Sequence, residues 1–98
     1  MTQTYTYILE LDGGTFVSQV VSDGIDESIE KWIVGIRNDP ITKNALSEFV
    51  ISQIRQSVVD PDTGIIALKG IKDVWYNDLE TDLGNGHLHI VLSEKNES

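Results

Sequence analysis

The chain has 98 residues, enough for one domain around one hydrophobic core, and a formal net charge of −9 at pH 7. Sixteen carboxylates against seven lysines and arginines argue against nucleic acid and anionic membranes as partners, because both attract cationic side chains; a basic protein remains permitted. Without cysteine, a basic signal-peptide start or an apolar run long enough to span a bilayer, we expect a single cytoplasmic domain over residues 1–98.

Two strands joined by a tight turn are predicted at the N-terminus. Residues 4–11 alternate, and the side chains that we expect on one face are Tyr5, Tyr7, Leu9 and Leu11. Residues 15–21, TFVSQVV, are β-branched and aromatic and predict a second strand. Asp12-Gly13-Gly14 between them tolerates positive φ. A phosphate-binding loop would lead from a strand into a helix, so this segment indicates a hairpin turn instead.

Two amphipathic helices are predicted in the middle of the chain. We expect the first to begin after an N-cap at Asp23 and to bury the stripe Ile25, Ile29, Trp32, Ile33 and Ile36. Gly35 inside it costs about 1 kcal/mol relative to alanine and allows close packing on a neighbour. Asp39-Pro40 ends this helix and begins the next, over about 41–57. Its predicted buried side is Ala45, Leu46, Phe49, Val50, Ile54 and Val58.

The last third of the chain predicts two further strands, over residues 70–78 and 86–93, with a turn at Gly84-Asn85-Gly86. Residues 58–68 fit either a short strand or a buried connector after a turn, and residues 94–98 are expected to be a frayed tail. The order strand, strand, helix, helix, strand, strand predicts an α+β fold: a four-stranded antiparallel sheet with two helices packed on one face.

A histidine pair is the first candidate for chemistry. His87 and His89 alternate along a strand and should share one face, where they could supply two metal ligands. A third ligand would have to come from Asp82, Glu80 or Asp78 in the acidic segment 78–82, and no spacing enforces this. In the alternative interpretation Leu88 and its alternating neighbours face the core while both histidines face water or a partner. No cofactor is expected.

Adjacent aromatic residues are the second candidate. Trp75 and Tyr76 must point to opposite faces of a strand, so one should join the core and the other lie on the uncovered side of the sheet. Aromatic anchors are frequent in protein interfaces, and the interface candidates are Trp75, Tyr76, His87 and His89.

No nucleophile motif is present, and no catalytic residue is assigned. The sequence therefore predicts a small acidic, non-enzymatic module that binds a protein partner, which the charge allows to be basic, or that pairs with itself as a homodimer through an open sheet face. The alternative is a regulatory domain that binds a small molecule or a metal through His87, His89 and the loop 78–82.

Overall fold

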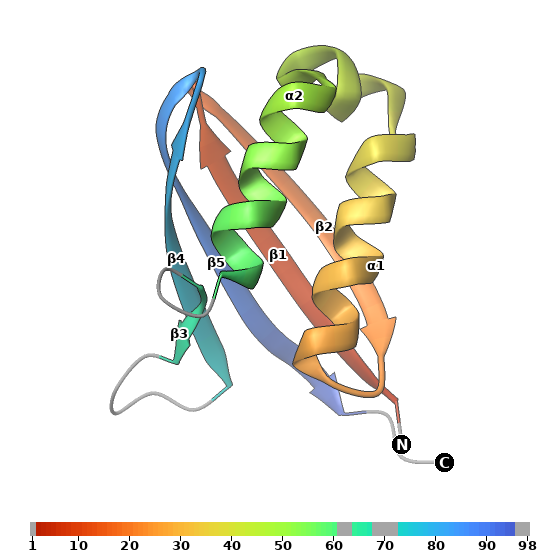
Figure 1. Cartoon of the computed structure of the whole chain (residues 1–98). Coiled ribbons are helices and arrows are strands. Elements are labelled where there is room, and N and C mark those ends of the chain that lie inside the picture. The colour runs from red at the N-terminus through yellow and green to blue at the C-terminus, as the bar shows by residue number, and fades with distance from the viewer. Residues whose placement is uncertain (1, 61–63, 68–72, 96–98) are drawn as a thin grey trace.

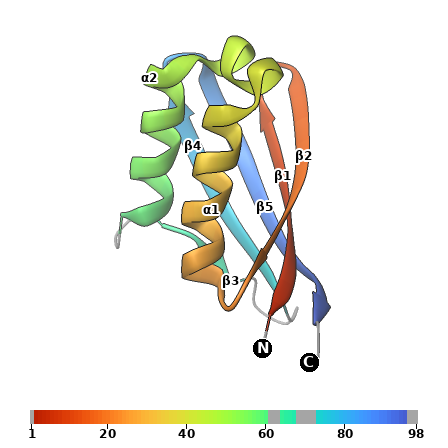
Figure 2. The ribbon, with the colours of Figure 1, turned by 90° about the vertical axis from the view of Figure 1, so that its right-hand side faces the viewer.

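The predicted α+β architecture is confirmed by a computed structural model, which describes residues 2–60, 64–67 and 73–95 (Figure 1). A fifth, two-residue strand is added to the four predicted strands at one edge of the sheet. Its elements are β1 (Gln3–Leu11), β2 (Gly14–Ser22), α1 (Ile25–Asn38), α2 (Pro40–Val59), β3 (Ile66–Ala67), β4 (Val74–Thr81) and β5 (Gly84–Lys95). All strand pairs are antiparallel, in the order β2-β1-β5-β4-β3, so β5 lies between β1 and β4. Seen from the side, both helices lie on one face of the sheet (Figure 2).

The N-terminal hairpin turns at Asp12 and Gly13, as predicted. Both residues have positive φ, 53° and 75°, and Leu11 pairs with Gly14 across the turn. Positive φ at both central residues is what a two-residue hairpin turn requires, because its twist then matches that of the strands. Asp12 and Gly13 therefore reverse the chain and join two long strands without a bulge.

Helix α1 begins one residue later than expected. Its N-cap is Gly24, with no side-chain cap, so the prediction of Asp23 was wrong. The hydroxyl of Ser22 accepts from the Gly24 N–H at 3.3 Å and donates to the Gly24 carbonyl at 2.9 Å, which fixes the exit from β2 at Gly24. The predicted apolar stripe faces the core. Gly35, in contrast, packs against nothing, since a Cβ there would have no neighbour within 4 Å.

Helix α2 begins where predicted but is interrupted. Asp39 caps it by accepting from the Ile41 N–H at 3.1 Å, and Pro40 follows. Ser47 has φ 70°, and its hydroxyl accepts from the Val50 N–H at 3.3 Å, as an N-cap would for a second helical segment. Because the two segments differ in rotation, one apolar stripe cannot cross the kink.

The buried side of α2 consequently differs from the prediction at several positions. Ala45 and Phe49, which were expected inside, are exposed. Ile51 and Thr42 are buried instead, beside the correctly predicted Leu46, Val50, Ile54 and Val58. The helix reaches Val59, and β3 pairs Ile66 with Tyr76, so the described part of 58–68 includes a short strand.

The β4–β5 hairpin turns at Asp82-Leu83, and the predicted turn at Gly84-Asn85-Gly86 was wrong. The Thr81 hydroxyl accepts from the Leu83 N–H at 3.1 Å and donates to the Gly84 carbonyl at 3.0 Å, which closes the turn. Asn85 and Gly86 belong to β5. Of the strand expected over 70–78, residues 70–72 lie outside the described residues. The tail expected over 94–98 was wrong for residues 94 and 95, which belong to β5 and pair with β1, and residues 96–98 lie outside the described residues.

The core lies between the helices and the sheet face that they cover. It holds the predicted face of β1 together with Leu79, Leu88 and Ile90. The ring of Tyr7 stacks on Trp32 at a centroid distance of 4.8 Å, and its hydroxyl donates to Ser28 Oγ at 2.5 Å. Ser28 in turn donates to the Ile25 carbonyl at 2.8 Å, so the buried hydroxyl groups are satisfied.

Candidate functional site

The sheet face opposite the helices, called the open face below, carries a row of apolar and aromatic side chains. Strand register places these side chains next to one another across all five strands, in the order Val17, Ile8, His89, Tyr76 and Ile66. Val17 and Ile66 at the two ends are 63% and 65% exposed. A contiguous band of apolar and aromatic side chains on a water-facing sheet is typical of a contact surface.

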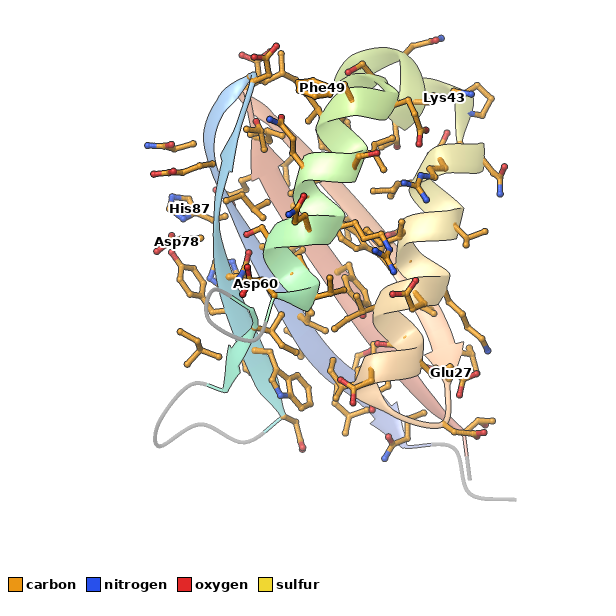
Figure 3. The ribbon with its side chains drawn as sticks, viewed as in Figure 1. Glu27, Lys43, Phe49, Asp60, Asp78 and His87 are labelled. Atoms are coloured by element: carbon orange, nitrogen blue, oxygen red, sulfur yellow. The ribbon has the colours of Figure 1, made fainter. Side chains whose placement is uncertain are left out.

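Tyr76 is the centre of a small polar cluster on this face, formed with Asp78, His87 and His89. Its ring lies 6.0 Å from the ring of His87 and 5.0 Å from that of His89. Its hydroxyl donates to Asp78 Oδ1, and His87 Nδ1 lies 3.0 Å from the same oxygen. Figure 3 shows Asp78 and His87 together on the side of the sheet away from the helices. These contacts hold the Tyr76 ring in one orientation.

The electrostatic character of the open face is negative. The hydrogen bond from Tyr76, and secondarily that from His87, holds the pKa of Asp78 below its usual value, so this group stays ionised at neutral pH. The same bond raises the pKa of Tyr76, because ionisation would place two negative charges side by side. Glu10, paired with His87, and Glu80, two residues beyond Asp78, add further carboxylates.

The described cationic side chains lie away from this face. The lysines and arginines whose side chains the structure describes all lie on α1 and α2: Lys31, Arg37, Lys43 and Arg55. Three of them pair with helix carboxylates, those of Glu27, Glu48 and Glu30. Within the described side chains, the open face therefore has carboxylates and histidines but no lysine or arginine.

The histidine pair shares the open face, as its spacing predicted, but Asp82 does not join it. Asp82 lies in the hairpin turn, four residues beyond Asp78, which is roughly 13 Å along a strand. Its N–H donates to Gln53 Oε1 of α2 at 2.8 Å. Across residues 2–60, 64–67 and 73–95, no three His, Asp or Glu side chains gather closely enough to hold a metal ion.

The two adjacent aromatic residues divide between the faces. Trp75 packs against the core, with its ring 5.9 Å from that of Tyr5, whereas Tyr76 lies on the open face. Of the four interface candidates, the open face therefore contains Tyr76, His87 and His89. The sequence interpretation missed Val17 and Ile66. Alternation along the strands could have placed both residues on this face, but their position in the row depends on strand register.

Comparisons with protein-family models, with curated proteins and with solved structures found no match to this chain. Among the described residues, neither helix is sufficiently long and apolar to cross a membrane. The support for a function therefore comes from the composition and geometry of the chain itself.

Proposed function

We propose that this domain is a non-enzymatic protein-interaction module that binds a basic protein through its open face. The observation that carries the proposal is the apolar row across the sheet, bordered by carboxylates and free of described lysine or arginine side chains. Protein interfaces combine an apolar, aromatic centre with a polar rim, and this face has both parts.

Tyr76 is the proposed anchor. Tyrosine is enriched among the residues that dominate binding energies, and an anchor held in place before binding loses less conformational entropy. The contacts of Tyr76 with Asp78, His87 and His89 provide this restraint. A partner should therefore cover the Tyr76 ring and place cationic groups near Asp78 and Glu10.

The charge distribution favours a different protein over a second copy. Each copy has a formal charge of −9, and two open faces brought together would place carboxylates opposite carboxylates. A basic partner would instead be attracted over a long range, and its association should slow as salt is added. The alternative metal site gains less support, because the Tyr76 ring packs against both histidines.

Removal of the anchor provides the test. We expect Tyr76→Ser to weaken retention of a lysate partner on the immobilised chain by roughly tenfold or more, as is usual for an interface anchor. The control is Phe49→Ser, because Phe49 is an exposed aromatic residue on α2 (Figure 3). It should retain the partner as the parent does.

Three outcomes would contradict the proposal. The two variants could retain the same partner equally well, or the retained protein could be acidic and insensitive to salt. Sedimentation could also show a parent dimer that Tyr76→Ser dissociates, which would place a second copy on the open face.

A further inference from the structure

The outer edge of β2 is an unprotected strand edge. β2 is nine residues long, lies at the end of the sheet and pairs with β1 on its inner side. In natural proteins a charged residue, a proline or a bulge usually prevents an edge strand from pairing with another chain. The segment Gly14–Ser22 contains no charged residue and no proline, and its register with β1 is unbroken.

The backbone groups on this edge can be assigned from the hairpin. In a two-residue hairpin the residues flanking the turn, here Leu11 and Gly14, bond to each other, and bonding then alternates along the strand. Thr15, Val17, Gln19 and Val21 therefore direct their N–H and C=O groups outward. The Val21 carbonyl accepts from Lys31 Nζ at 2.9 Å, which agrees with this assignment. Of the described residues, none supplies a backbone partner for the outward groups of the other three.

A groove of about 510 Å³ runs beside this edge. Figures 1 and 2 both place α1 next to β2. Residues of both elements line the groove. Its helix side is formed by Trp32, Gly35 and Ile36, with Ile41, which is 78% exposed, at the start of α2. The missing side chain of Gly35 leaves open space there.

We propose that an extended segment of a partner protein adds as a strand to the outer edge of β2. Its main chain would bond to Thr15, Val17 and Gln19, and alternate apolar side chains would enter the groove. The net charge of −9 favours a segment with basic flanks. This site is distinct from the open face, because it uses the backbone of β2 and the wall of α1.

A second copy of the chain fits this edge less well than a foreign segment. Two-fold pairing of β2 with β2 would present the helix-side chains Phe16 and Val20 of each copy, which already pack against their own core. Neither groove would then be filled. The side chains of a foreign segment are not already packed in a core of this domain, so the segment can place large apolar side chains beside Gly35.

Peptide selection on the intact chain tests the proposal. Random peptides displayed on phage should yield binders with apolar residues at alternate positions, and amide NMR should show their largest shifts at Thr15, Val17 and Gln19. Gln19→Pro removes one outward donor and leaves the main-chain β1–β2 bonds intact, although it also removes the exposed side-chain bond from Gln19 to Thr6. We expect it to weaken binding by roughly tenfold or more. Tyr76→Ser, which alters the open face, should bind the same peptides as the parent does.

Gly35→Leu fills the groove without changing any backbone group. It therefore tests peptide binding at this site even if Gln19→Pro does not fold. It should abolish peptide binding, while the control Gly35→Ala should retain it. The proposal would be overturned if no peptide is selected, if the shifts fall on Tyr76 and His87, or if Gly35→Leu binds like the parent. A dimer that Gln19→Pro dissociates, without peptide binding, would assign the edge to a second copy.

Discussion

Replacing Trp32 with alanine is expected to destabilise the domain by about 3–5 kcal/mol, a large part of the total for a chain of this size. Trp32 is 2% exposed, and its ring stacks on Tyr7 with an interplanar angle of 13°. Because this pair joins α1 to β1, the substitution leaves a cavity between the helix layer and the sheet.

Urea unfolding followed by circular dichroism measures this effect, since the transition midpoint falls with the free energy of unfolding. The control is Val34→Ala on the same helix, because Val34 is 55% exposed and its loss should change stability by less than about 0.5 kcal/mol. Equal midpoints for the two variants would mean that Trp32 does not hold the two layers together.

Gly86→Ala should lower the free energy of unfolding by roughly 3 kcal/mol, although it adds only one methyl group. A Cβ at this position would lie 2.5 Å from the Glu10 carbonyl oxygen and 2.8 Å from Leu11 Cδ1. The first of these neighbours is main chain, so no rotamer change can relieve the contact. The strands β1 and β5 would have to separate where Leu11, the last residue of β1, pairs with Gly86.

The matched control is Gly35→Ala. Its added methyl group meets open space, and the substitution replaces glycine, a poor helix former, with alanine. It should raise stability by up to about 1 kcal/mol, so the two Gly→Ala changes should shift the unfolding midpoint in opposite directions. If Gly86→Ala is as stable as the parent, the close approach of β5 to β1 is not present in solution.

Some features that depend on neighbouring residues were predictable from the sequence, but not all of them were. The alternation of Tyr5 to Leu11 and the Asp39-Pro40 helix start are local, and both predictions were confirmed. The non-helical backbone at Ser47, which interrupts α2, was not predicted. The N-cap of α1 and the β4–β5 turn are also local, but both lie at other residues than predicted, at Gly24 and at Asp82-Leu83.

The candidate site was also predictable only in part. A period of two placed His87 and His89 on one face without further information. Whether Trp75 or Tyr76 faces outward depends on which side the helices cover, and the apolar row depends on register. The exposed edge of β2 depends on strand order. Because β1 pairs with β2 on one side and with β5 on the other, β2 is left at the end of the sheet.

The most direct test of the open face as a binding surface is site-specific photo-crosslinking in cells. A benzophenone amino acid would replace Val91, which lies on the open face of β5, and in a second variant Val34, which is exposed on α1. We predict that the probe at 91 captures one basic protein and that the probe at 34 does not. Equal capture from both positions, or capture from 34 alone, would contradict binding through the open face.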